Sequence, residues 1–133
     1  MDRFGVKIKG IVRHKDEYLI VKKWYDDRIE DPYQWEFFDI HLQEGMTPEE
    51  QCLTYIQEST GIYARVTDIP YIWTYKLGDY PYLGIVFLCD LEEEEVVFLS
   101  EELVEYKWVK AEDLGQYIGN KTVLADMANA GIL

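Results

Sequence analysis

Cysteine and histidine are scarce in this 133-residue chain, which contains two of each. Cys52 and Cys89 lie far apart in the sequence, and neither they nor His14 and His41 show the close spacing of a zinc site. We therefore expect two buried thiols and no zinc chemistry.

Basic residues are also few, with 13 Lys and Arg against 26 Asp and Glu, which gives a formal net charge of -13. Binding to a nucleic-acid backbone needs clustered cations, so this balance argues against it, and it also opposes binding to an anionic membrane surface. Residues 92–95 are four consecutive glutamates, which we interpret as a solvated loop between strands.

Long apolar runs are missing as well, so no membrane span is predicted. The N-terminal residues alternate between polar and apolar types and show no apolar signal core, which favours a cytoplasmic protein without an export signal. Hydrophobic residues make up 48% of the chain, and neither a repeat nor a low-complexity linker interrupts it. The sequence therefore predicts one folded domain over residues 1–133.

The hydrophobic pattern predicts an α+β domain, with strands around one central helix and two helices near the C-terminus. The strands are expected at residues 4–13, 18–24, 35–38, 64–76, 82–91 and 104–109, with a loop at 25–34 and a turn near Gly78. The first two strands should form a hairpin. The C-terminal helices are expected at residues 111–117 and 122–130.

The central helix is the clearest element and is predicted at residues 48–60. Thr47 can cap it, Pro48 suits its first position, and Glu50 completes a capping box. Gly61 suits the left-handed position just beyond its end. One face should carry Leu53, Ile56 and Thr60 at helical spacing.

Residues 35–62 read WEFFDIHLQEGMTPEEQCLTYIQESTGI and resemble the Nudix box, G-x5-E-x7-R-E-U-x-E-E-x-G-U, where U is a bulky aliphatic residue. With Gly61 and Ile62 as anchors, Ile56 and Glu58 also fit. The hairpin before this segment and the strand and helix near the C-terminus are similar to those of the family. The resemblance spans nearly the whole chain and implies a Nudix-like α/β/α sandwich with a mixed central sheet, a box helix and C-terminal helices.

The departures from the pattern fall mainly on residues that do chemistry. Its first Gly and first Glu are replaced by Ile40 and Met46, and its Arg by Thr54. The family's metal-binding carboxylates would occupy the places of Tyr55, Glu58 and Ser59, which share one helix face at i, i+3 and i+4. A neutral phenol or hydroxyl is a poor ligand for Mg²⁺ beside an ionised Glu.

Nudix enzymes, as the resemblance implies, hydrolyse a pyrophosphate with the help of Mg²⁺ or Mn²⁺. We therefore expect a domain with a degenerate box and little or no catalysis, needing no cofactor and binding a nucleotide or a nucleoside diphosphate-linked ligand. Two alternatives stay open. One is an active Mg²⁺- or Mn²⁺-dependent pyrophosphohydrolase, with Glu58 as its catalytic residue and with Glu58, Glu102 and Glu105 as metal ligands. The other is a self-associating structural protein, because an aromatic-rich exposed sheet could form a homodimer interface.

Aromatic residues make up 15% of the chain, and most of them are expected in the core or on strand surfaces. Some could stack on a base or line a ligand cleft. The members of this set are Trp24, Tyr25, Tyr33, Trp35, Trp73, Tyr75, Tyr80 and Tyr82. From the aromatic residues, we assign ligand binding to Trp35, Trp73 and Tyr75, together with Tyr55, which should fill part of the cleft where a carboxylate is replaced.

Overall fold

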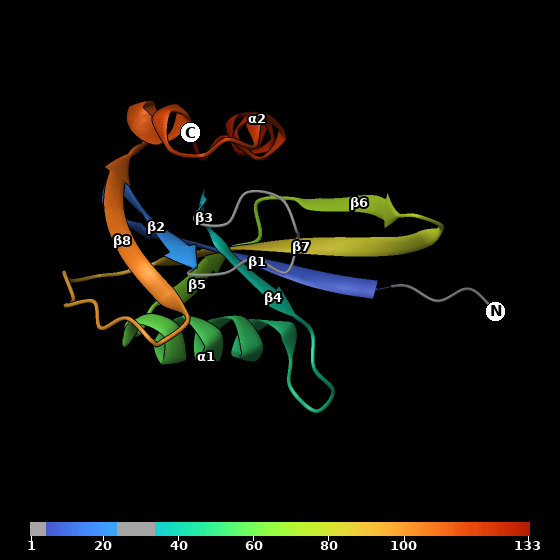
Figure 1. Cartoon of the computed structure of the whole chain (residues 1–133), viewed down its shortest axis with the longest axis horizontal. Coiled ribbons are helices and arrows are strands. Elements are labelled where there is room, and N and C mark those ends of the chain that lie inside the picture. The colour runs from blue at the N-terminus through green and yellow to red at the C-terminus, as the bar shows by residue number, and fades with distance from the viewer. Residues whose placement is uncertain (1–4, 24–33) are drawn as a thin grey trace.

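A mixed β-sheet forms the centre of the protein, in a computed structural model that describes residues 5–23 and 34–133 (Figure 1). The strands are β1 (Gly5–His14), β2 (Glu17–Lys23), β3 (Trp35–Glu36), β4 (Phe38–His41), β5 (Arg65–Asp68), β6 (Ile72–Leu77), β7 (Tyr80–Asp90) and β8 (Leu103–Lys110). The ends of the first two predicted strands, at Phe4 and Trp24, lie outside the described residues, as do Tyr25, Tyr33 and most of the predicted loop.

The predicted hairpin is confirmed, since β1 and β2 pair antiparallel with Val12 opposite Leu19. The sheet is mixed because β7 runs parallel to β1, with Ile8 opposite Ile85. The sheet order is β3-β2-β1-β7-β5, and β4, β6 and β8 pair with β1, β7 and β2. The central strands β1 and β7 therefore lie side by side and contribute buried side chains to both faces of the sheet.

Two predicted strands are each divided in the structure. Residues 35–38 form parts of β3, which pairs with β2, and of β4, which pairs with β1. The chain changes partner at Phe37, which is buried on the opposite face of the sheet from Phe38. The predicted strand 64–76 is interrupted by the segment around Pro70, because proline has no N–H to donate to a ladder.

Helix α1 (Pro48–Thr60) has the predicted bounds and the predicted ends. The Glu50 backbone N–H donates to Thr47 Oγ1 at 3.2 Å, and Gly61 adopts a left-handed φ of 75°. Its buried face is rotated slightly from the prediction, since Leu53 is only half-buried. The residues of α1 that are buried are Gln51, Cys52, Ile56, Ser59 and Thr60.

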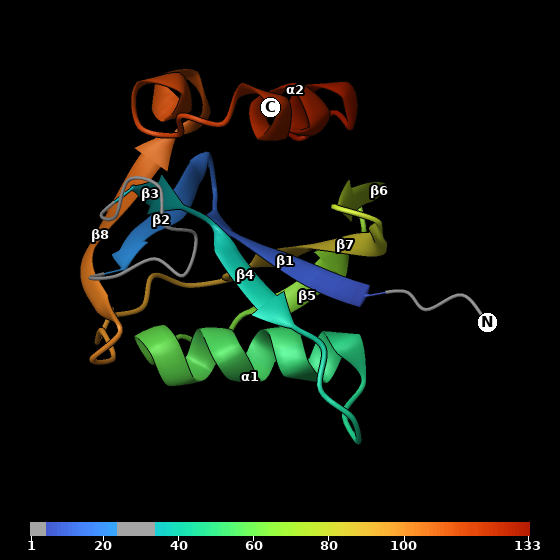
Figure 2. The same ribbon diagram turned by 45° about the vertical axis from the view of Figure 1, so that its right-hand side comes forward.

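Helices cover both faces of the sheet (Figures 1 and 2). Helix α1 packs on one face, and the 3₁₀ helix η1 (Ala111–Gln116) and α2 (Lys121–Asn129) lie on the other. The first of the two predicted C-terminal helices is thus a 3₁₀ helix. The α/β/α arrangement confirms the fold class that the resemblance implied.

The thiols of Cys52 and Cys89 are both buried and free, as predicted. The fold brings them together between α1 and β7, with their Sγ atoms 4.0 Å apart. The neighbouring Cys52 thiol and burial raise the pKa of Cys89. This thiol therefore stays protonated and behaves as a packing group.

The acidic segment 92–95 lies in a loop, as predicted, but two of its glutamates have partners. Glu92 forms an ion pair with Arg65 at 2.8 Å, and Glu95 accepts a hydrogen bond from the Tyr63 backbone N–H.

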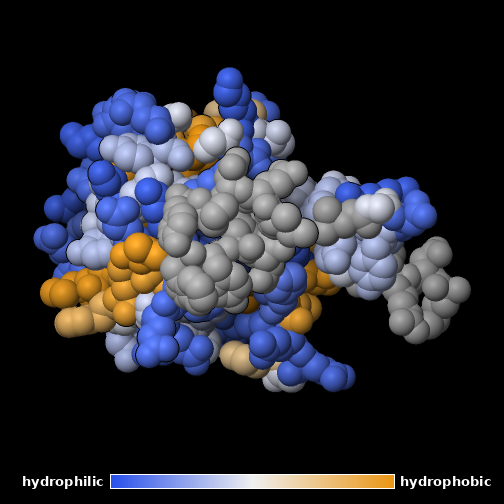
Figure 3. Space-filling model, in the orientation of Figure 1, coloured by the Kyte–Doolittle hydropathy of each residue, from blue (hydrophilic) through white to orange (hydrophobic). Residues whose placement is uncertain are grey.

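Figure 3 shows an apolar patch at the left, where β8 and the segment before it lie. The exposed apolar side chains of these segments include Val96, Phe98 and Val104. Among the described helices, none has the length and apolar character needed to cross a membrane.

Candidate functional site

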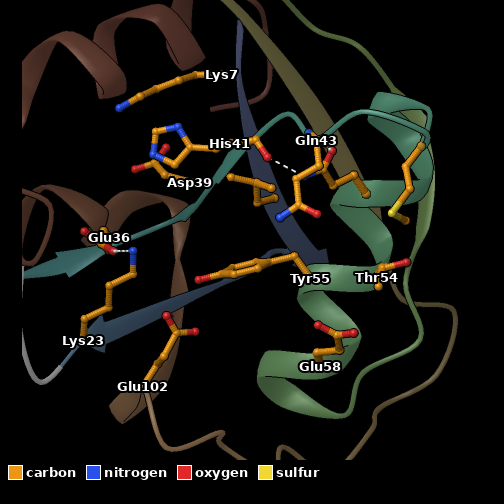
Figure 4. A pocket seen from close by; sticks show the side chains of 13 residues that line it. Lys7, Lys23, Glu36, Asp39, His41, Gln43, Thr54, Tyr55, Glu58 and Glu102 are labelled. Atoms are coloured by element: carbon orange, nitrogen blue, oxygen red, sulfur yellow. Dashed lines mark hydrogen bonds and ion pairs between the residues drawn. The ribbon is translucent and has the colours of Figure 1, made fainter. Parts of the chain in front are cut away.

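A pocket of about 430 Å³ opens between α1 and β4, on the side of the sheet where the box-like segment folds (Figure 4). Strand β4 supplies the consecutive residues 39–41, and α1 supplies one helix face. Its lining residues are Lys7, Lys23, Glu36, Asp39, Ile40, His41, Gln43, Met46, Gln51, Thr54, Tyr55, Glu58 and Glu102.

Tyr55 occupies the middle of this pocket. Figure 4 shows it reaching from α1 towards the ion pair of Lys23 and Glu36. Its ring meets Phe38 edge to face, with 6.3 Å between ring centroids. Burial raises the pKa of Tyr55 and outweighs the lowering effect of the nearby Lys23 ammonium. The phenol is therefore neutral at physiological pH and offers a hydrogen bond without a charge.

Two lysines around the pocket are paired with carboxylates. Lys9 Nζ donates to Asp39 Oδ1 at 2.8 Å, and Lys23 Nζ lies 3.4 Å from Glu36 Oε1. Lys7 has no ion pair within the described part of the chain, and it lies opposite His41 in the β1–β4 register. The Lys7 and His41 side chains therefore form the basic end of the pocket, as the upper part of Figure 4 shows.

Carboxylates mark the other end of the pocket. Glu58 and Glu102 both line it, both are exposed, and both lie below Tyr55 in Figure 4. The third predicted ligand, Glu105, does not line this pocket and lies 3.7 Å from Lys22 on β2. Ser59, at a carboxylate place of the resembled box, is buried with 2% exposure.

The donor set does not fit the divalent metal that the resemblance implies. In residues 5–23 and 34–133, no cluster of three or more His, Cys, Asp or Glu side chains is placed to hold an ion. Mg²⁺ and Mn²⁺ prefer several hard oxygen ligands. Asp39 and Glu36 are engaged with lysines, and two exposed glutamates are left, so we derive no chemical step through a metal.

Gln51 fixes the turn that leads from β4 into α1. Its side-chain amide donates to the backbone carbonyl of His41, and its Oε1 accepts from the Gln43 N–H at 2.7 Å. Because Gln51 is buried, these two bonds hold the edge of the pocket rigidly against α1. The sequence prediction missed Lys7 and His41, which the pairing of β1 with β4 brings together. It also missed Gln51 and Lys23, which reach the pocket from α1 and β2 without a local pattern that marks them.

The three predicted ligand-binding aromatics on strands do not line this pocket. Trp35 packs on the α2 side of the sheet, where its ring lies under the ammonium groups of Lys22 and Lys107 and meets Tyr117 edge to face. Trp73 also packs on the α2 side, and Tyr75 lies beside it on β6. Of the seven predicted site residues, the pocket brings together Tyr55, Glu58 and Glu102.

Comparison with solved structures finds close likeness in fold at low sequence identity. A MutT protein from Methanosarcina mazei Go1 superposes with a TM-score of 0.77 at 20% identity, over 98% of this chain and 94% of that one. An Ap4A hydrolase from C. elegans in a binary complex gives 0.76 at 17% identity, over 93% of each chain. The NUDIX domain of NrtR from Shewanella oneidensis, complexed with ADP ribose, gives 0.74 at 10% identity, over 97% and 89%.

The sequence itself carries little of this likeness. No family profile matches it, and no curated protein matches it either. What the solved structures share with this chain is therefore the arrangement of the sheet and the helices around it.

Proposed function

Because the chain has the Nudix fold, we propose that it binds a nucleotide or a nucleoside diphosphate-linked ligand in the pocket beside α1, with little or no hydrolysis. A fold can carry many functions, so the proposal depends on the side chains of the site. The solved neighbour that contains ADP ribose gives the class of ligand to try first.

The observation that carries the proposal is the position of Tyr55. Its neutral ring fills the middle of the pocket, in a place where the resembled box has a metal-binding carboxylate. Because the described residues offer no cluster of carboxylates to hold a divalent metal ion, the positive charge that balances a bound diphosphate would have to come from a side chain. Lys7 can supply it, since no described residue forms an ion pair with it.

The two ends of the pocket fit different parts of such a ligand. Phosphate oxygens would accept hydrogen bonds from Lys7 Nζ and from His41 at the basic end. The exposed carboxylates of Glu58 and Glu102 would repel phosphate but accept hydrogen bonds from the hydroxyl groups of a sugar. This polarity orients the ligand with its diphosphate towards β1 and its sugar towards α1.

A second candidate is a metal-dependent hydrolase with unusual ligands, and one observation favours it. Glu58 and Glu102 approach the same pocket from α1 and from the segment before β8. A rate enhancement through Mn²⁺ would require that these two carboxylates recruit an ion together with the substrate phosphates. The ligand-binding candidate predicts binding without metal, whereas the hydrolase predicts product release that depends on metal.

The test is a thermal-shift and product assay of the full chain with ADP-ribose and UDP-glucose, in EDTA and in Mn²⁺. We expect a rise in Tm in EDTA, because ligand that binds only the folded state stabilises it. We expect no phosphate-containing product in either condition. Release of product that depends on Mn²⁺ and is lost in Glu58→Gln would reject the proposal in favour of the hydrolase.

Two lysine variants make the assay specific to the pocket. Lys7→Ala removes the lysine at the basic end of the pocket and should abolish the Tm shift. Lys110→Ala removes an exposed lysine at the far end of β8 and should keep it. An equal shift in both variants would show that the ligand does not use the basic end of the pocket.

A further inference from the structure

Two aromatic rings of the β6–β7 hairpin, those of Trp73 and Tyr82, lie directly over glycines of the sheet, and the Tyr75 ring is stacked with both. A Cβ atom added to Gly84 would lie 2.2 Å from the Trp73 ring, and one added to Gly5 would lie 2.2 Å from the Tyr82 ring. Each ring therefore covers a glycine directly, in space that any side chain would fill. Tyr75 lies between them in the series, with interplanar angles of 11° to Trp73 and 13° to Tyr82.

These rings form a parallel, offset stack. The centroid of Tyr75 is 6.2 Å from that of Trp73 and 5.2 Å from that of Tyr82. Two rings that rest on the sheet and a third parallel to both form one aromatic surface, which we call the aromatic platform (Trp73, Tyr75 and Tyr82). Its lower face is against the backbone, so its upper face points away from the sheet.

Polar groups and hollows border the platform at both ends. On the α2 side, Asp126 and Asn129 line a hollow of about 280 Å³ together with Tyr71 and Trp73. At the other end, a hollow of about 470 Å³ is lined in part by Tyr80, Tyr82 and His41. Figures 1 and 2 show how the β6–β7 hairpin extends along the sheet beside α2.

We propose that the aromatic platform binds a neutral, β-linked pyranose oligosaccharide. The ring of a pyranose with equatorial hydroxyls has a face of C–H groups, whose partial positive charge suits the negative face of an aromatic ring. Its hydroxyl groups point outwards around its edge, where Asp126 and Asn129 can accept or donate hydrogen bonds. A β-linked chain is extended and ribbon-like, so successive sugars can follow this row of parallel rings.

The charge around the platform favours a neutral ligand over a nucleic acid. Burial, followed by the nearby carboxylates of Asp126 and Asp39, raises the pKa of Tyr71 to about 12. These carboxylates and the net charge of -13 would repel a phosphodiester backbone. A ligand without phosphates can therefore stack on the platform without this repulsion. Its hydroxyl groups can donate hydrogen bonds to the carboxylates at the rim.

The test is a titration of the full chain with cellohexaose, followed by tryptophan fluorescence and by isothermal titration calorimetry. We expect saturable binding at millimolar or lower concentration, a change in tryptophan emission, and about tenfold weaker binding in Tyr75→Ala. Tyr75→Phe should retain binding because it keeps the ring. Maltohexaose, whose α-linked chain coils, should bind more weakly than cellohexaose.

Matched variants separate the platform from the rest of the protein. Tyr106→Ala removes an aromatic ring that is 41% exposed on β8, and it should bind cellohexaose like the unmodified chain. Tyr55→Ala alters the pocket beside α1 and should also leave saccharide binding unchanged, so the two proposals can fail independently. If Tyr75→Ala does not fold, Asp126→Ala tests the rim of the platform by the same titration.

Three results would overturn this assignment. The first is the absence of saturable cellohexaose binding, and the second is an equal loss of binding in Tyr75→Ala and Tyr106→Ala. The third is a concentration-dependent dimer that Tyr75→Ala dissociates, which would assign the platform to contact with a second copy of the chain. Analytical ultracentrifugation of the same variants distinguishes this last result.

Discussion

The guanidinium of Arg13 holds the carboxylate of Asp90 through two hydrogen bonds, of 2.7 and 2.9 Å, across the parallel pair β1 and β7. Thr67 on β5 adds a third bond, from its hydroxyl to the same carboxylate at 2.5 Å. Burial would raise the pKa of Asp90, but the hydrogen bonds from Arg13 and Thr67 outweigh it and lower the pKa below its ordinary value. One carboxylate thereby connects three strands.

The first prediction concerns this carboxylate and pH. Because the folded-state pKa of Asp90 is lowered, its contribution to stability is present at neutral pH and is lost as pH falls below about 4. Asp90→Asn should lower the free energy of unfolding at pH 7 by about 1 kcal/mol and should flatten the acid limb of the pH profile. Urea unfolding between pH 3 and 7 measures both effects.

A matched acid on the surface controls for general loss of charge. Asp113→Asn changes a carboxylate in η1 whose only described partner is the Gln116 amide, at 3.4 Å. It should leave the acid limb unchanged. An equal flattening in both variants would show that Asp90 has no special role.

The second prediction concerns the ends of α1. Thr47→Ala removes the oxygen that accepts from the Glu50 N–H, and Gly61→Ala places a side chain at a left-handed φ of 75°. Each should cost about 1 kcal/mol of stability without changing the bounds of the helix. Chemical denaturation measures the cost. Gly115→Ala, where an added Cβ meets nothing within 4 Å, should have a much smaller effect.

These helix ends also show what the sequence could predict. Thr47, Pro48 and Gly61 act through neighbours a few residues away, so their roles can be recognised in the sequence. The bounds of α1 and the β1–β2 hairpin follow from such local signals. The Nudix fold was recognised because several local signals occur in the family's order and spacing.

The pocket could be predicted only in part, because its electrostatics depend on pairing between distant strands. Lys7 meets His41, and Lys9 meets Asp39, only when β1 pairs with β4. That pairing depends on the chain changing partner at Phe37, which no local signal within residues 35–38 marks. The sequence shows many aromatic residues, but the face on which Trp73 lies depends on where β6 begins.

The third prediction concerns the glycine beneath Trp73. Gly84→Ala would place a Cβ 2.2 Å from the ring, so the ring must lift away from the sheet. We expect a red-shifted tryptophan emission and greater quenching by acrylamide, because the lifted ring becomes more exposed. Gly119→Ala, which has open space around the added Cβ, should change neither. Unchanged emission in Gly84→Ala would show that Trp73 does not rest on the glycine in solution.

The last prediction concerns a variant that introduces a second carboxylate into the α1 face of the pocket. Tyr55→Glu would place a carboxylate one helical turn from Glu58, and i, i+3 carboxylates can converge on one ion. We expect this variant to bind Mn²⁺ more tightly in calorimetry and to lose the Tm shift given by ADP-ribose in EDTA, because a second anion repels the diphosphate. Gln57→Glu adds the same charge on α1 but outside the pocket, so it should do neither. Equal Mn²⁺ affinity in the two variants would mean that the side chain at residue 55 does not decide whether this pocket holds a metal.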